Sequence, residues 1–274
     1  MLRITVLAEN TAGGRNLIAE HGLSLWIIAG DRRLLFDTGQ GMALGPNARA
    51  LEIDLGTADG IILSHGHYDH AGGFAQVLSS TRRIPVYAHP NVFESKYSIR
   101  SSSGVQDIGM PLDAADSIQM YGDFSPITES TDLGSGVFLT GPIPRLTDFE
   151  DVGGPFFRDA AGREPDNLVD DQAMYYVDND GVAVVLGCAH SGVINTLRYV
   201  RELTNGRPIR AVIGGMHLVA ATDDRMRKTI EALREFDIRL LGPMHCTGPG
   251  ATARIWSAFP DRCVALPTGK SIDL

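Results

Sequence analysis

The chain has 274 residues, 43% hydrophobic and 21% charged, which is the composition of a globular protein with a sizeable core. Its formal net charge of −9 argues against a nucleic-acid partner, because proteins that bind phosphate backbones need a basic face. The sequence has no apolar run near the roughly twenty residues of a membrane helix, and it has no secretory signal. Its three cysteines do not have the spacing of a disulfide framework. We therefore expect a reduced, cytoplasmic protein without membrane contact.

Short strands that precede helices dominate the first half of the sequence. Alternating or apolar runs bounded by turn residues predict the strands, and the pattern of residues 74–80 suits a helix. The strands are expected at residues 2–8, 23–30, 31–39, 60–64 and 84–90.

The second half of the sequence continues this alternation. Turn residues at 179–181 lie within a predicted hairpin over residues 173–187. Strands that alternate with helices, with hairpins among them, predict a layered α/β fold with mixed sheets. Helices are expected at residues 193–204, 223–236 and 251–259, and strands at 209–215, 238–245 and 263–269.

Two polar stretches interrupt the pattern. Residues 91–135 and 142–171 are weakly periodic, and strand signals resume between them at 135–141. We therefore expect a single domain over residues 1–274 with two inserted loops, which in compact domains are more often functional than idle. The acidic run at 148–151 is expected to be a solvated part of the second loop.

The histidines carry the strongest chemical signal. Three of the eight, His65, His67 and His70, fall within six residues, and Asp69 lies among them. Positions 65, 67 and 69 share parity on an extended turn and can point the same way, while His70 can swing toward the same centre from the start of a helix. Imidazole and carboxylate ligands at this spacing suit zinc or another first-row divalent ion.

A second pair of metal-capable side chains follows the apolar run that ends at Gly187. Cys188 and His190 stand where a strand would turn into a helix. Taken alone, they are more readily explained as a buried thiol and a hydrogen-bonded core histidine than as metal ligands.

These motifs resemble a known family. The stretch HGHYDH resembles the H-x-H-x-D-H motif of the metallo-β-lactamase superfamily, LLFDTGQG its first motif and GPMHCTG its last. The resemblance extends over nearly the whole chain and implies a four-layer αβ/βα sandwich with two mixed β-sheets. Within the superfamily, EHGLSLWI, GCAHSGVINT and GGMHL resemble the branch named for a dihydropterin–ribofuranosylaminobenzene phosphate synthase of methanopterin biosynthesis.

The resemblance implies a site for two divalent metal ions, zinc in the first place and iron or manganese as alternatives. It assigns His65 and His67 to the first metal, and it assigns Asp69, His70 and His245 to the second.

The third ligand of the first metal departs from the superfamily pattern. The superfamily usually places a histidine after a strand near the middle, and VFLTGPIPR, which lies at the corresponding place, contains none. His190 is the favoured replacement because a neutral imidazole binds without adding charge. Cys188 competes with it, at a place where the superfamily usually has a bridging aspartate or a cysteine.

Three further roles concern residues beside the metals. Asp69 can orient an attacking hydroxide as well as bind metal. Asp37 can hold a ligand histidine from behind, or can cap the turn at Thr38-Gly39, and both can be true. His217 can bind a substrate oxyanion or protonate a leaving group, with a local structural role as the alternative.

The leading function is a binuclear hydrolase whose metal-bound hydroxide attacks a phosphoester or a diphosphate-bearing small molecule. The branch resemblance implies an alternative, a transferase that joins a dihydropterin methyl diphosphate to a ribosylated aminobenzoate with loss of pyrophosphate and carbon dioxide. A non-catalytic metal- or ligand-binding module is the third hypothesis. The expected partner is a small molecule, phosphorylated or pterin-like, and the sequence carries no signal for oligomeric state.

Overall fold

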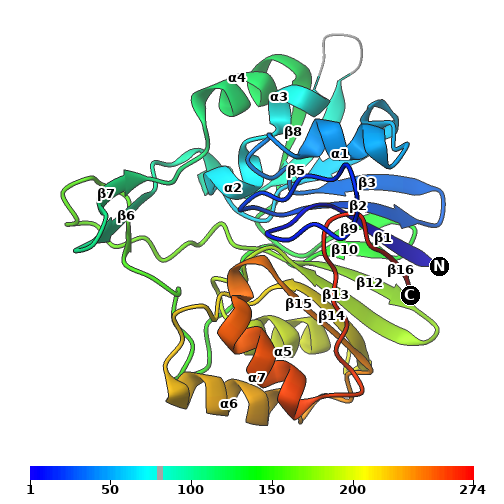
Figure 1. Ribbon diagram of the computed structural model, residues 1–274, viewed down its shortest axis with the longest axis vertical. Helices are drawn as coiled ribbons and strands as arrows, with labels where there is room; N and C mark the ends of the chain where they lie inside the picture. The colour runs from blue at the N-terminus through cyan, green and yellow to red at the C-terminus, as the bar shows by residue number, and fades with distance from the viewer. Residues whose placement is uncertain (79–82) are drawn as a thin grey trace.

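Two β-sheets face each other across the middle of the molecule (Figure 1). The computed structural model of the chain describes residues 1–78 and 83–274. The larger sheet has the strand order β16-β1-β2-β3-β4-β5-β8 and the smaller one β15-β14-β13-β12-β10-β9. The larger sheet consists of β1 (Leu2–Ala8), β2 (Ser24–Ala29), β3 (Arg32–Phe36), β4 (Gly60–Ile62), β5 (Ile84–Ala88), β8 (Gly122–Pro126) and β16 (Ser271–Asp273). The smaller sheet consists of β9 (Thr131–Gly134), β10 (Val137–Leu139), β12 (Met174–Asp178), β13 (Gly181–Leu186), β14 (Ile209–Gly215) and β15 (Leu240–Met244).

Helices cover the outer face of each sheet. Figure 1 shows the first four α-helices above the larger sheet and the last three below the smaller one. The α-helices are α1 (Leu44–Ala50), α2 (Tyr68–Ala71), α3 (Phe74–Val77), α4 (Leu112–Tyr121), α5 (Val193–Leu203), α6 (Asp223–Leu233) and α7 (Pro249–Ala258). Short 3-10 turns add η1 (Leu55–Thr57), η2 (Pro90–Phe93) and η3 (His245–Thr247).

Alternation along the strands builds three apolar layers. In β13, Val182, Val184 and Leu186 pack against α5, α6 and α7, whereas Ala183 and Val185 point into the space between the sheets. A strand that is buried on both faces reads as a continuous apolar run, which is why this stretch contains no polar residue. The architecture is a four-layer αβ/βα sandwich with mixed sheets, as the sequence predicts.

Strand direction explains where the functional residues gather. β3 and β4 run parallel in the larger sheet, and β13, β14 and β15 run parallel in the smaller one. Because parallel strands end at the same edge of a sheet, the segments that follow them are brought together there. The metal-capable residues after β4, β13 and β15 are therefore neighbours in space despite wide separation in the sequence.

The two polar stretches differ from simple loops. Residues 91–135 contain α4 and also β8 and β9, which belong to the two main sheets. Only the part around β6 (Tyr97–Arg100) and β7 (Gly104–Asp107) projects from the sandwich, and it pairs with β11 (Phe156–Phe157) of the second stretch in a separate three-stranded sheet (Figure 1). The weak periodicity reflects short strands with exposed faces.

Two expected elements have different bounds. The strand expected at 263–269 is wrong, because this segment forms only two isolated bridges, from Cys263 to Leu241 and from Thr268 to Ala12. The last strand is β16 at Ser271–Asp273. Pro267 interrupts that segment, since proline has no N–H for a ladder hydrogen bond. The helix expected over 74–80 is α3, Phe74–Val77, and positions 79 and 80 lie outside the described residues. None of the helices in the described ranges is long and apolar enough to cross a bilayer.

Candidate metal centre

The His-Gly-His turn between β4 and α2 positions the first histidines. His67 is the extended residue before α2, and its ring lies beside that of His65, with Nε2 of His65 2.9 Å from Nδ1 of His67. Gly66 has no side chain because a Cβ there would collide with the carbonyl of Val92. Its N–H donates to Oδ2 of Asp170 at 2.8 Å, which fixes the turn between the two histidines.

His190 joins His65 and His67 in a first group. One ligand atom from each lies within 4.8 Å of the others, and all three side chains are buried. Nδ1 of His190 lies 2.8 Å from the carbonyl of Val152, an arrangement that leaves Nε2 to face the group. The Nε2 atoms of His67 and His190 are buried without a hydrogen-bond partner among the described residues. Since buried polar atoms are normally satisfied, these nitrogens fit a bound cation.

Asp69, His70 and His245 form a second group beside the first. Nε2 of His70 lies 3.2 Å from Nε2 of His245, and Oδ2 of Asp69 lies 3.3 Å from the same His245 atom. His21, which has no spacing signal in the sequence, reaches Oδ2 of Asp69 at 3.2 Å. The donor set of imidazoles and one carboxylate suits a divalent first-row metal.

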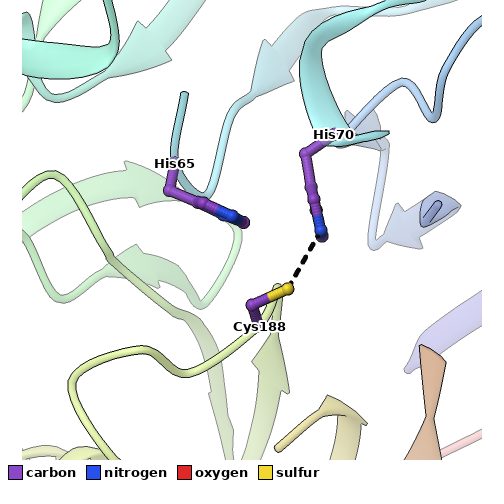
Figure 2. A group of neighbouring side chains, drawn as sticks. All are labelled: His65, His70 and Cys188. Carbon is purple, nitrogen blue, oxygen red and sulfur yellow. Dashed lines mark hydrogen bonds between the residues drawn. The ribbon is translucent and has the colours of Figure 1, made fainter. Parts of the chain in front are cut away.

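Cys188 lies between the two groups. Figure 2 shows its side chain pointing toward those of His65 and His70, and its Sγ is 3.1 Å from Nε2 of His70. The Sγ also lies within 4.8 Å of ligand atoms of His245 and Cys246. His190 and Cys188 therefore occupy different places: His190 completes the first histidine group, and Cys188 is within reach of both.

Burial keeps most of these imidazoles neutral. It holds the pKa of His65, His67 and His190 well below the ordinary value, and neighbouring imidazoles add to this. Burial also raises the pKa of the Asp69 carboxyl, but the imidazole of His70 and other histidines outweigh it, so this pKa is well below its usual range. A neutral imidazole and an ionised carboxylate are the forms that bind metal.

Asp37 supports the second group from behind. Its Oδ2 accepts from Nδ1 of His70 at 2.6 Å and from Oγ of Ser64 at 2.7 Å, while its Oδ1 accepts from the Ser64 N–H at 2.7 Å. It is fully buried and belongs to none of the candidate metal groups in the described chain. The contact with His70 is the one expected of a residue that holds a ligand histidine from behind. The contacts with Ser64 join the end of β3 to the segment that follows β4.

Backbone strain is concentrated around the centre. Asp37, Ala189, His217 and His245 adopt positive φ angles between 44° and 56°. Such conformations cost about 1–3 kcal/mol each for residues other than glycine and persist where the surroundings enforce them. All four lie on the turns that follow β3, β13, β14 and β15 at the edge where the histidines meet.

His217 faces the first group from the turn that follows β14. Its ring centroid lies 4.2 Å from that of His190, and its Nδ1 is buried without a partner in the described chain. The backbone N–H of His217 approaches Sγ of Cys246 at 3.3 Å. The side chain lines a cavity of about 440 Å³ that also reaches His67, Asp69 and His245.

Sequence reasoning missed the acidic residues that hold this edge together. Asp170 accepts from Gly66 and from Nζ of the buried Lys96, the latter at 2.9 Å. Burial raises the pKa of Asp171, which accepts from the N–H of Ser191, to about 6. Glu150 is not simply solvated as expected: it is half-buried and accepts from the N–H groups of Ile194 and Asn195 in the first turn of α5. The only sequence signal for these residues is the adjacent pair Asp170 and Asp171, which directly precedes the apolar stretch of β12.

Asp170→Asn is expected to lower the free energy of unfolding by about 2 kcal/mol. Gly66 and Lys96 donate to different oxygens of Asp170, and asparagine replaces one of these oxygens by an NH₂ group, so one buried donor would lose its acceptor. Urea unfolding checks this, with the exposed Asp261→Asn variant as the matched control. Equal losses in both variants would contradict the anchoring role of Asp170.

The comparisons with known proteins agree with this geometry. The family model of the metallo-β-lactamase superfamily matches residues 18–245. The chain belongs to the metallo-β-lactamase superfamily. A solved structure of this superfamily, described as a metal-dependent hydrolase, superposes with a TM-score of 0.86 at 28% identity and covers 100% of this chain and 99% of that one.

Two curated proteins from Methanocaldococcus jannaschii are also similar to this chain over nearly their full length. One is an uncharacterised protein, 32% identical over 92% of this chain and 93% of its own. The other is a 7,8-dihydropterin-6-methyl-4-(β-D-ribofuranosyl)-aminobenzene-5′-phosphate synthase, 29% identical over 99% of this chain and 96% of its own. The superfamily and the branch resemblance expected from the sequence are thus confirmed.

Proposed function

We propose that this chain is a binuclear metal-dependent hydrolase that acts on a phosphoester or a diphosphate-bearing small molecule. The observation that carries the proposal is the pair of buried, unpartnered Nε2 atoms of His67 and His190, which face a cluster of further metal-capable side chains. His65, His67 and His190 would hold one ion, and Asp69, His70 and His245 the other, with Cys188 within reach of both.

Divalent ions bound there would make a water molecule acidic at neutral pH and would neutralise charge on substrate oxygens. The imidazole and thiol donors favour zinc, while iron or manganese would be better served by more oxygen donors. We therefore propose zinc as the native metal, from the chemistry of the donor set.

The residues of the chain would then position the reactants and move protons. Asp69, ionised and hydrogen-bonded by His21 and His245, can hold an attacking water by accepting its proton in a hydrogen bond. The unpartnered Nδ1 of His217 can bind a substrate oxygen or deliver a proton to a leaving group. Phe156, whose ring lies 5.4 Å from His67 and 5.4 Å from His190, shields this edge from water.

A synthase is the second candidate, because a curated synthase matches this chain almost from end to end. In that reaction the same cavity would hold a diphosphate that leaves as pyrophosphate. Supplying the dihydropterin diphosphate and the ribosylated aminobenzoate separates the two functions: a synthase releases pyrophosphate only when both are present, whereas a hydrolase acts on a single substrate.

Metal removal tests the proposal directly. We expect about two metal equivalents per chain by elemental mass spectrometry. Chelation should abolish hydrolysis of phosphodiester and diphosphate substrates, and zinc should restore it. Near-stoichiometric metal without turnover of either substrate class would instead indicate a non-catalytic metal-binding module, and activity that survives complete metal loss would refute the metal-dependent mechanism.

A further inference from the structure

A polar wall of the cavity is formed by the hairpin of β6 and β7. Ser98 and Arg100 alternate with Ile99 along β6, and Gln106 pairs with Ser98 across the hairpin. All three polar residues line the same cavity as His67 and Asp69. Ile99 points the opposite way, toward Gly162.

The charge of Arg100 is not compensated within the protein. Its Nε donates to Oγ of Ser98 at 3.3 Å, and no carboxylate of the described residues lies within ion-pair distance of its guanidinium. Nearby arginines differ: Arg158 approaches Glu94 at 3.6 Å and Arg163 approaches Asp159 at 3.7 Å. Among the residues that line the cavity, Arg100 is the one permanent cation.

The hairpin is held in place at its base. Lys96, which directly precedes β6, is buried between Asp166 and Asp170, with Nζ–oxygen distances of 3.3 and 2.9 Å. Ser98 pairs with Phe156, whose ring contacts His67. The same network therefore fixes both the His-Gly-His turn and the strand that carries Arg100.

The conformation around Arg100 leaves its guanidinium free. Gly104 lies opposite on β7 with a φ of 70°, and the space where its side chain would stand is open. The terminal nitrogens of Arg100 make no hydrogen bond to any described residue. They can therefore form a bidentate contact with an oxyanion, supported by the hydroxyl of Ser98 and the amide of Gln106.

We propose that Arg100, with Ser98 and Gln106, forms the binding site for a phosphate group of the substrate that is not the group being cleaved. The inference rests on the proposed function, because the reacting group would be held at the histidine cluster in the same cavity. It narrows the substrate class to small molecules with a second phosphate, in which the bond to be broken is separate from the phosphate that Arg100 recognises.

Binding of inorganic phosphate and pyrophosphate to the purified full-length protein, measured by calorimetry, tests the site without requiring turnover. We expect Arg100→Ala to weaken binding by about 10-fold or more, because a charge-assisted contact is lost. Arg100→Lys should lose less, since an ammonium keeps the charge but not the fork. Arg163→Ala, which removes an arginine 81% exposed and paired with Asp159, is the matched control and should bind as the parent does.

The outcomes separate this site from the proposed reaction. Equal affinity of the parent and Arg100→Ala for both phosphates would overturn the inference, whatever the activity of the enzyme. Binding of succinate with the same affinity and the same dependence on Arg100 would overturn phosphate as the ligand class. If the parent binds phosphate but hydrolyses no phosphoester, and Arg100→Ala loses the phosphate binding, the proposed reaction fails and the phosphate site stands.

Discussion

Replacing His67 by alanine is expected to abolish turnover and to reduce bound metal by about one equivalent per chain. Its Nε2 is buried and unpartnered at the centre of the first group, so alanine removes a donor that no described neighbour replaces. Loss of a residue that merely supports a ligand already costs about 10–100-fold in affinity or activity, and loss of the ligand itself should exceed 100-fold. Elemental mass spectrometry and initial rates at saturating added zinc check both effects.

The chain offers a matched control for this substitution. His89 is the one described histidine that belongs to none of the candidate metal groups, and its Nδ1 accepts only from the N–H of Asn91. His89→Ala should keep its metal and its activity within a few-fold of the parent. Full metal content and activity in His67→Ala would show that His67 is not a metal ligand and would refute the first group of ligands.

Local periodicity explains why much of the fold could be predicted from the sequence. The bounds of β1 at Leu2–Ala8 and β14 at Ile209–Gly215 match the apolar runs, because alternation and burial are local properties of a strand. The predicted bounds were wrong where pairing between distant segments determines whether a strand forms. An example is β16, which forms because residues 271–273 pair with β1. A three-residue edge strand of this kind leaves no periodic signal.

The candidate centre was predictable to the extent that its residues are close in the sequence. His65, His67, Asp69 and His70 lie within six positions, so parity on an extended turn and the start of a helix suffice to bring them together. His245 could be predicted only from the resemblance to the superfamily. His190 could be predicted only because the superfamily's usual third histidine is missing from this sequence.

The supporting network could not be predicted because it joins distant segments. Lys96 and Asp170 are 74 positions apart, and neither belongs to a recognisable motif. A lysine in a polar stretch normally indicates a solvated surface, and only the folded chain shows that this one is 1% exposed. The place of Arg100 in the cavity depends on the same contacts, so it too emerges only from the structure.

Asp37→Asn is expected to weaken metal binding by about 10–100-fold and to change how the stability of the metal-free protein depends on pH. Burial lowers the pKa of His70, but the carboxylates of Asp37 and Asp69 outweigh it and raise this pKa to about 9. Because this value lies above the ordinary 6.5, protonated His70 stabilises the metal-free protein fully below pH 6.5, and the contribution disappears as the pH rises through 9. Its size is on the order of 3 kcal/mol.

Asparagine at position 37 keeps the shape of the side chain and removes the charge that contributes most to the raised pKa of His70. Urea unfolding of the chelated protein between pH 6 and pH 9.5 should therefore show a decline in stability for the parent and a flatter profile for Asp37→Asn. The exposed Asp31→Asn variant, far from any histidine contact, should follow the parent profile. Parallel profiles for the parent and Asp37→Asn would mean that Asp37 does not set the charge of His70, and its role would reduce to joining β3 and β4 through Ser64.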